Sequence, residues 1–193
     1  MHHIVPRFCN QCGAAQGAPS VPAGDDRLRD LCHACGHIQY WNPKIIVGAL
    51  PIWGEQVLLC KRAIEPRLGK WTLPAGFMEE NETLAQGATR ETLEEANARI
   101  EVGALYTVIS LPDISQVYML FLAALVDLDF HAGSESLDVR LFREDEIPWD
   151  ALAFKTIHAT LTHYFAERRL GVAAGTSVFT QKVMTLRKPL SGA

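Results

Sequence analysis

Three glutamates, Glu91, Glu94 and Glu95, are spaced so that they share one face of a helix. Offsets of three and four residues place side chains within about 100° of one another around a helix axis. Carboxylates at that spacing repel one another unless a cation neutralises them. Carboxylate oxygens are the ligands that Mg²⁺ and Mn²⁺ prefer, and Mg²⁺ commonly binds substrate phosphates as well. The cluster therefore predicts a divalent-metal site suited to phosphate chemistry.

The helix that carries these glutamates has clear start and stop signals. Thr83 is a good N-cap, and Gln86, three residues later, can complete a capping box. Asn97 is well suited to the left-handed conformation that ends many helices. We therefore expect the helix to run from Leu84 to Ala96.

The remaining main domain is expected to alternate strands with one further helix. Strands are predicted at 45–50, 56–60, 99–110, 115–125 and 137–142, with a hairpin turn at 53–55, a loop at 65–76 and a helix at 155–169. The second helix should bury its apolar positions Ile157, Leu161, Tyr164 and Phe165. Cys60 is expected to be a small core residue of its strand. This order favours an α/β fold with a mixed sheet between helices.

Four of the five cysteines form two Cys-x-x-Cys-Gly pairs, Cys9 with Cys12 and Cys32 with Cys35. This pattern favours a tetrahedral Zn²⁺ site with four thiolate ligands over disulfides or redox chemistry. Disulfides are less expected because we anticipate no export signal and a reducing, cytoplasmic location. Four thiolates close the coordination sphere, so the zinc should be structural. Short strands are expected at 27–31 and 37–41.

Composition excludes few function classes. The formal charge of −4 and the pI of about 6.0 argue weakly against duplex DNA as the main ligand. No stretch reaches the roughly 20 apolar residues of a membrane-spanning helix.

The run from Gly76 to Asn97 resembles the Nudix box of diphosphate hydrolases. In that box a Gly is followed after five residues by a Glu, and after seven more by Arg-Glu-hydrophobic-x-Glu-Glu-x-Gly-hydrophobic. The matching residues are Gly76, Glu82, Arg90, Glu91, Glu94 and Glu95. Thr92 stands at a hydrophobic position, where its methyl group can face the core, and Asn97 replaces the Gly that ends the helix.

The Nudix resemblance implies an α/β/α sandwich with a mixed sheet, preceded by a zinc ribbon. We expect the ribbon at 1–40, the Nudix domain at 41–171 and a C-terminal tail at 172–193. The resemblance implies that Glu91, Glu94 and Glu95 are ligands of Mg²⁺ or Mn²⁺. A backbone carbonyl near Gly76 is expected to complete the site.

Further roles follow from the same resemblance. Arg90 is expected to orient the cluster by pairing with Glu82 or Glu91. Water deprotonated by a carboxylate would attack one phosphorus in line. An additional carboxylate often comes from a later loop, where Glu135 is the first candidate, ahead of Glu144 and Glu146. All three are at least as well explained as surface residues.

Outside the box, several segments resemble zinc-ribbon Nudix enzymes, above all plant chloroplast FAD and ADP-ribose pyrophosphatases and their bacterial relatives. The segments are Phe8–Gly13, Asn42–Lys44, Val57–Arg62, Trp71–Gly76, Glu135–Leu137, Arg140–Phe142 and Asp145–Pro148. The resemblance implies cleavage of a nucleoside diphosphate linked to another group, FAD or ADP-ribose, with release of AMP. NADH pyrophosphatase or NAD-RNA decapping activity is the alternative, although the stretch 110–117 lacks the Ser-Gln-Pro-Trp element of those enzymes.

Two residues outside the box are candidates for substrate contacts, each with an ordinary structural explanation beside it. Arg62 either binds phosphate or is a solvated charge, and Tyr118 either stacks on a base or belongs to the strand core. A second alternative for the whole chain is a nucleic-acid or regulatory binding module without hydrolysis, which the intact glutamates disfavour. Homodimers are common among similar enzymes, so a dimer is a further expectation.

Overall fold

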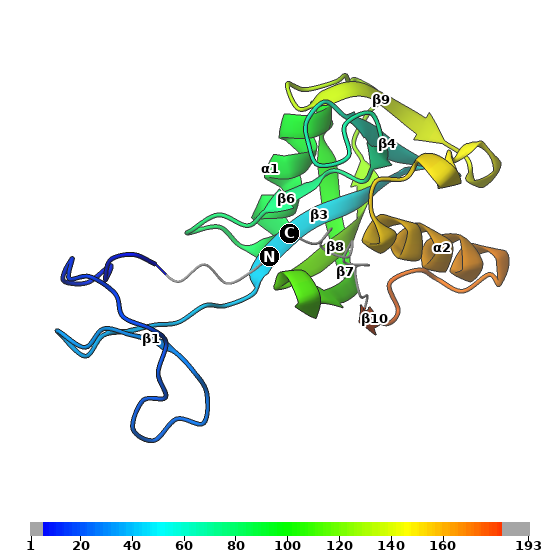
Figure 1. The fold of residues 1–193 in the computed structure, drawn as a ribbon. Coiled ribbons are helices and arrows are strands. Elements are labelled where there is room, and N and C mark those ends of the chain that lie inside the picture. The colour runs from blue at the N-terminus through cyan, green and yellow to red at the C-terminus, as the bar shows by residue number, and fades with distance from the viewer. Residues whose placement is uncertain (1–5, 183–193) are drawn as a thin grey trace. The chain divides into compact units, whose positions relative to one another are not determined.

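A computed structural model describes residues 6–182 of the chain (Figure 1). The structure divides into two compact units, and the boundary along the chain falls between Pro43 and Lys44. Among the described residues, no helix has the length and apolar character needed to cross a membrane.

The second unit is built on one mixed β-sheet. Its strands are β3 (Lys44–Trp53), β4 (Gln56–Arg62), β5 (Trp71–Thr72), β6 (Ala75–Phe77), β7 (Ile100–Leu111), β8 (Gln116–Leu125), β9 (Ser136–Phe142) and β10 (Phe179–Lys182). The order is β10-β7-β8-β3-β4-β5, with β6 paired to β3 and β9 paired to β4. The β3–β8 and β10–β7 pairs are parallel and the other pairs are antiparallel, as a mixed sheet requires.

Two helices, α1 (Leu84–Ala96) and α2 (Lys155–Arg169), cover opposite faces of this sheet (Figure 1). Strand β4 shows how the sequence achieves this, because successive side chains of a strand point to opposite faces. Leu58 and Cys60 are buried in one cluster with the end of α1. Val57 and Leu59 are buried in another cluster, which contains all four predicted inward residues of α2. The predicted three-layer α/β/α arrangement is confirmed.

Three short 3-10 helices connect elements of the second unit. They are η1 (Pro112–Ile114) between β7 and β8, η2 (Glu144–Glu146) after β9, and η3 (Trp149–Ala151) before α2. The predicted hairpin between β3 and β4 is present, with Gly54 at a φ of 58° in its turn.

Strand pairing corrects two expectations. The predicted loop at 65–76 contains β5 and the start of β6, which pair antiparallel with β4 and β3. The predicted tail contains β10, which pairs parallel with β7, and the Phe179 ring stacks on His163 with centroids 4.3 Å apart. Strands this short acquire their structure from pairing and packing, which local sequence patterns do not report. Residues 183–193 of the predicted tail lie outside the described residues.

The first unit contains β1 (Asp30–Leu31) and β2 (Ile38–Gln39), which pair antiparallel. These strands lie inside the predicted ranges 27–31 and 37–41 and are shorter than those ranges. Asp30 is almost fully buried, and its Oδ2 accepts a hydrogen bond of 2.7 Å from the indole of Trp41. With so little regular structure, this unit depends on other links to hold its loops together.

Candidate metal centres and active site

The helix that carries the glutamates begins and ends where the sequence predicts. The Thr83 hydroxyl accepts a hydrogen bond from the Gln86 amide at 3.2 Å, and the Gln86 side-chain oxygen accepts one from the Thr83 amide at 2.8 Å. Asn97 follows the last turn with a left-handed φ of 48°. The predicted capping box and C-cap are both confirmed, and α1 therefore has a fixed start and end.

One side of α1 is packed into the protein. Ala88, Thr92 and Ala96 are fully buried, and the Thr92 hydroxyl donates to the Ala88 carbonyl at 2.7 Å. A buried hydroxyl needs such a partner, because an unpaired one is costly. Threonine at this position is thus accommodated without a change in the helix.

The glutamates differ in exposure. Glu91 and Glu95 are buried, whereas the side chain of Glu94 is 58% exposed. Burial, with a further contribution from the charge of Glu91, raises the pKa of Glu95 to about 8. Burial also raises the pKa of Glu91, although Arg90 partly opposes that shift. Two buried carboxylates one helical turn apart carry more negative charge than their surroundings neutralise, which a divalent cation would correct.

Arg90 connects this cluster to the loop before α1. Its Nε and Nη2 donate to the two carboxylate oxygens of Glu82 at 3.0 and 2.8 Å. Its Nη1 donates to Glu91 at 2.7 Å and to Glu94 at 3.1 Å, and Nη2 also donates to the Phe77 carbonyl at 3.1 Å. Glu82 or Glu91 was the expected partner, and Arg90 contacts both. The bidentate pair with Arg90 lowers the pKa of Glu82 to about 2.

Strand β6 passes directly against Glu91. A Cβ added to Gly76 would lie 2.3 Å from each carboxylate oxygen of Glu91, so only glycine leaves room for that carboxylate. The amide of the neighbouring residue Ala75 donates to Glu95 at 3.4 Å. The backbone at Gly76 is therefore beside two of the three glutamates, where its carbonyl was expected to serve as a ligand.

Donor atoms of the glutamates do not converge as tightly as those of a complete metal site. Within residues 6–182, the four cysteines alone form a group of three or more metal-binding side chains with donor atoms all within 4.8 Å. The Arg90 Nη1 lies between the Glu91 and Glu94 carboxylates and bonds to both. The assignment of the glutamates as Mg²⁺ or Mn²⁺ ligands stays a prediction.

Two further predicted residues act electrostatically on the cluster. The charge of Glu135 raises the pKa values of Glu91 and Glu95, and the charge of Arg62 lowers the pKa of Glu95. Arg62 is held by a hydrogen bond from its Nε to the Pro66 carbonyl at 2.9 Å. Both residues therefore lie close enough to the end of α1 to shift the pKa values of its glutamates.

The Arg62 guanidinium also lies over the ring of Phe154, 5.3 Å from its centroid. Phe154 was not predicted from sequence, because no local pattern relates the end of β4 to the residue that precedes α2. Tyr118 is buried beside Ile46 and Ile109, and burial raises its pKa. This placement favours the strand-core interpretation of Tyr118 over base stacking.

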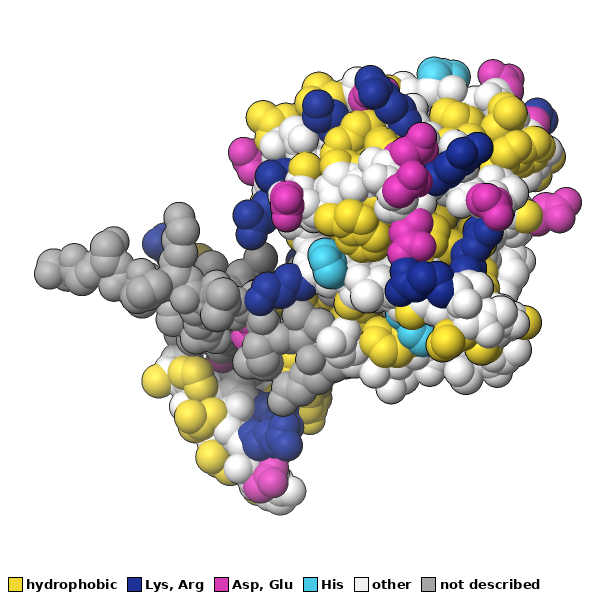
Figure 2. All heavy atoms as spheres, turned by 90° about the vertical axis from the view of Figure 1, so that its right-hand side faces the viewer, with side chains coloured by type: hydrophobic (Ala, Val, Ile, Leu, Met, Phe, Trp, Pro, Cys, Tyr) yellow, Lys and Arg dark blue, Asp and Glu magenta, His cyan; other side chains and the backbone are white. Residues whose placement is uncertain are grey.

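The two reserve carboxylates have partners elsewhere. Glu144 forms an ion pair with Arg169 at the end of α2, on the sheet face opposite α1. Glu146 accepts a hydrogen bond from the Arg143 amide at 2.9 Å. Of the three later glutamates, Glu135 is thus the one associated with the box. Figure 2 shows that acidic and basic side chains are interspersed over the face of the second unit that carries α2 and β9.

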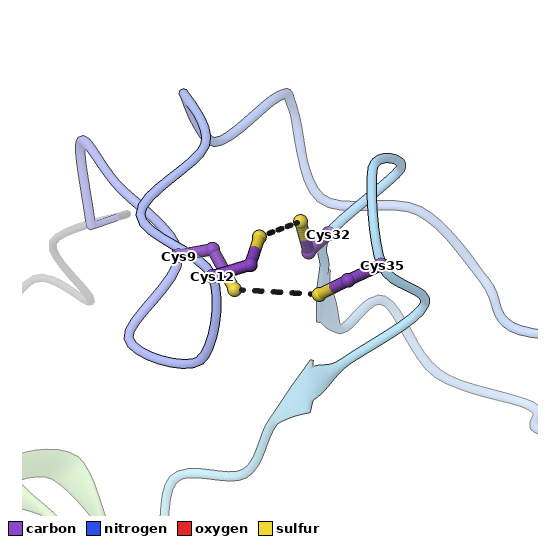
Figure 3. A group of neighbouring side chains, drawn as sticks. All are labelled: Cys9, Cys12, Cys32 and Cys35. Atoms are coloured by element: carbon purple, nitrogen blue, oxygen red, sulfur yellow. Dashed lines mark hydrogen bonds between the residues drawn. The ribbon is translucent and has the colours of Figure 1, made fainter.

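The four cysteines of the first unit converge as their spacing predicts (Figure 3). The Cys9 and Cys35 sulfurs are 3.8 Å apart, and those of Cys12 and Cys32 are 3.7 Å apart. A tetrahedral zinc with Zn–S bonds of about 2.3 Å requires sulfurs about 3.8 Å apart. All five cysteines of the chain are free thiols in the structure, so the disulfide alternative is not realised.

A backbone turn follows each cysteine pair. Gly13 and Gly36 follow the two pairs with φ values of 74° and 75°, a conformation that glycine adopts without strain. Backbone amides of the turn donate to the Cys32 sulfur and lower its pKa to about 7. Thiolates are the metal-binding form of cysteine, so the lowered pKa of Cys32 favours metal binding at that thiol.

Two family models match this chain. The model of the NUDIX domain matches residues 42–165, and the model described as Nudix N-terminal, a zinc ribbon, matches residues 7–41. The chain belongs to the Nudix family. Its mixed sheet between two helices and its cysteine cluster agree with a Nudix fold preceded by a zinc ribbon.

Individual Nudix proteins show the same relationship. The NAD-capped RNA hydrolase NudC of Yersinia pestis (strain Pestoides F) is 32% identical over 148 residues, which are 74% of this chain and 53% of that protein. The chain thus spans about half the length of the curated relatives it matches. A NUDIX hydrolase structure from Nitrosomonas europaea is 57% identical with a TM-score of 0.88, covering 93% of this chain and all of that one.

A more distant structure supports the fold alone. It is an ADP-ribose pyrophosphatase from Streptococcus suis, 20% identical with a TM-score of 0.58, which covers 74% of this chain and all of its own.

Proposed function

We propose that this Nudix protein hydrolyses the diphosphate bond of nucleoside diphosphates linked to another group and releases AMP. The observation that carries the proposal is the packing of Gly76 against Glu91, on a helix whose Arg90 bonds to Glu82, Glu91 and Glu94. A solvated surface helix would need neither the close approach nor a shared guanidinium. This arrangement holds the carboxylates in place. They could face a diphosphate only if cations lay between the carboxylates and the phosphates.

Glu91, Glu94 and Glu95, with the carbonyl of Gly76, would hold Mg²⁺ or Mn²⁺. The bound ions would neutralise substrate charge, polarise the phosphoryl oxygens and make water more acidic. Arg90 orients the carboxylates, because it bonds to two of them while Glu82 holds its other edge. Glu135 would add a further carboxylate and accept a proton from the attacking water.

Arg62 is proposed to bind a substrate phosphate. Its Nε is already bonded to the Pro66 carbonyl and its planar group lies over Phe154, so the guanidinium is oriented before substrate arrives. An oriented guanidinium loses less freedom on binding an anion. Tyr118 stays a candidate base contact, although its buried ring is a weaker one.

FAD or ADP-ribose is the proposed substrate. NADH or NAD-capped RNA is the second candidate, favoured by the sequence similarity to the NAD-capped RNA hydrolase NudC. FAD would yield AMP and FMN, and ADP-ribose would yield AMP and ribose 5-phosphate. The proposed substrates share an adenosine diphosphate portion, so the group beyond the second phosphate should determine preference.

The ribbon at 1–40 is proposed to bind one Zn²⁺ through Cys9, Cys12, Cys32 and Cys35 and to perform no chemistry. A Nudix domain at 41–171 completes the proposed domain division, and β10 from the predicted tail adds a strand to its sheet. We further propose that the protein forms a homodimer, which sedimentation or light scattering would test.

A product assay tests the function. Purified protein with Mg²⁺ or Mn²⁺ is incubated with FAD, ADP-ribose and NADH in parallel, and AMP is measured by chromatography. The expected result is metal-dependent AMP release that is lost in Glu94→Gln. Absence of product from all three, together with tight RNA binding, would instead support a non-catalytic binding module.

A further inference from the structure

The loop between β8 and β9 is hydrogen-bonded to the C-terminal end of α1. The His131 amide donates to the Ala96 carbonyl at 2.9 Å, and the Gly133 amide donates to the Glu95 carbonyl at 3.0 Å. The last carbonyls of a helix have no partner within the helix and need one from elsewhere. This loop supplies those partners directly behind the glutamates.

Gly133 permits this contact because it has no side chain. A Cβ at this position would lie 1.8 Å from the Glu94 carbonyl oxygen and 2.9 Å from the Glu94 carbonyl carbon. These are backbone atoms of a capped helix, so they cannot rotate away. Any larger residue must therefore move the loop away from α1.

Asn97 makes a second link between the same two segments. Its side-chain amide donates to the His131 carbonyl at 3.2 Å, while its left-handed backbone ends the helix. The Nudix box has glycine here, and glycine would end the helix equally well. Glycine has no side chain to reach His131, so the extra hydrogen bond belongs to the asparagine of this chain.

Glu135 follows this anchored stretch within two residues. The Ser136 amide donates to the Gly133 carbonyl at 3.1 Å, and the Ala63 amide donates to the Glu135 carbonyl at 2.8 Å. The backbone of Glu135 is thus fixed between the end of α1 and the end of β4. Its side chain is exposed, two residues after the glycine whose amide is bonded to the Glu95 carbonyl.

We infer that Asn97 and Gly133 are positioning residues that set the place of the Glu135 carboxylate relative to the glutamates of α1. The inference rests on the proposed function, because it gives Glu135 a place in the same reaction. Both residues act through Glu135 and neither contacts the substrate. Loosening either link should therefore reduce turnover and metal affinity only while Glu135 is present.

The test is a double-mutant cycle on the full chain. Asn97→Gly, Gly133→Ala and Glu135→Gln are made singly, and each of the first two is combined with Glu135→Gln. Ser134→Ala, an exposed position in the same loop, is the matched control. Two quantities are measured: kcat and KM for ADP-ribose, and the Kd for Mn²⁺ by calorimetry without substrate. Circular dichroism establishes that each variant is folded.

Gly133→Ala is expected to lower kcat by about tenfold or more, since displacement by about 1 Å costs up to 10²-fold in an active site. Asn97→Gly should lower kcat about threefold with little change in KM, because it keeps the helix end and removes one neutral hydrogen bond. Both should weaken Mn²⁺ binding. Neither should have any further effect in the Glu135→Gln background, since residues that act through one group are not additive.

Equal losses with and without Glu135, or wild-type values in Asn97→Gly and Gly133→Ala, would overturn the inference. Should Gly133→Ala not fold, Asn97→Gly alone decides. A wild-type protein that binds Mn²⁺ but makes no product would refute the proposed function, and the Mn²⁺ affinities would then decide the positioning inference. A wild-type protein that binds no Mn²⁺ would overturn both.

Discussion

One added methyl group at Gly76 would test whether the position of Glu91 controls turnover. In Gly76→Ala the new Cβ would start 2.3 Å from both Glu91 carboxylate oxygens, whereas real Cβ contacts essentially never fall below 3.0 Å. The carboxylate must therefore retreat by about 0.7 Å or more. A displacement of about 1 Å in an active site costs about 10²-fold in rate, which is roughly 2.7 kcal/mol in the activation free energy.

The fold should tolerate the same change. The clash involves the far end of a flexible side chain, so rotation of Glu91 can relieve it. That rotation breaks the 2.7 Å hydrogen bond from Arg90, and a charged hydrogen bond contributes about 1.5–3 kcal/mol to stability. Such a loss is smaller than the roughly 5–15 kcal/mol by which domains are stable. Gly76→Ala should therefore be folded and nearly inactive.

The assay measures kcat for ADP-ribose over a range of Mg²⁺ concentrations, together with thermal unfolding by circular dichroism. Gly103→Ala in β7 is the control, because its Cβ would meet only the Leu122 carbonyl at 3.2 Å and none of the glutamates. It should keep wild-type kcat. A folded Gly76→Ala protein with kcat within threefold of wild type would refute the proposed control of turnover by Glu91.

Three further predictions concern the two metal centres and the Arg90 network. Glu94→Gln and Glu95→Gln should each lower kcat by about 10²- to 10³-fold while leaving the circular dichroism spectrum unchanged, and full activity in either would reject the ligand assignment. The pKa of Glu82 is lowered from 4.5 to about 2, so its stabilising contribution is present above pH 4.5 and is lost as the pH falls towards 2. Glu82→Gln should therefore flatten the loss of stability in that range, measured by urea unfolding, and an unaltered pH profile would contradict the role of its pair with Arg90. Removal of zinc by a chelator should destabilise the amino-terminal unit, and an identical melting curve after metal analysis proves its loss would exclude a structural zinc.

Local rules were sufficient for the helix that carries the site. Thr83, Gln86 and Asn97 determined the bounds of α1 because capping depends on residues within one turn. The same rules could not find β5 or β10, which have few residues and owe their structure to pairing with distant strands. Sequence spacing likewise predicted the cysteine cluster, because zinc ligands from two turns follow a fixed pattern.

Contacts around the site were harder to predict. The Asn97 substitution could be explained as a helix end from sequence, but its hydrogen bond to His131 joins two segments that only the fold brings together. The support of Arg62 by Phe154 has the same origin. Residue types therefore identified the chemical groups, whereas the sheet and its loops determined which groups meet.

Charge balance explains why these contacts are needed together. Glu91, Glu94, Glu95 and Glu135 bring four carboxyl groups to the C-terminal half of α1, and Glu82, in the loop before α1, adds a fifth through its bonds to Arg90. The guanidinium groups of Arg90 and Arg62 act on these carboxyl groups. Burial, with the negative charge of Glu91 added to it, raises the pKa of Glu95 to about 8. Arg90 cannot offset all of this negative charge, since Glu82 already takes two of its hydrogen bonds. A substrate diphosphate would add still more negative charge. Under the proposed function, divalent cations would therefore be the components that allow this helix and that substrate to occupy one site.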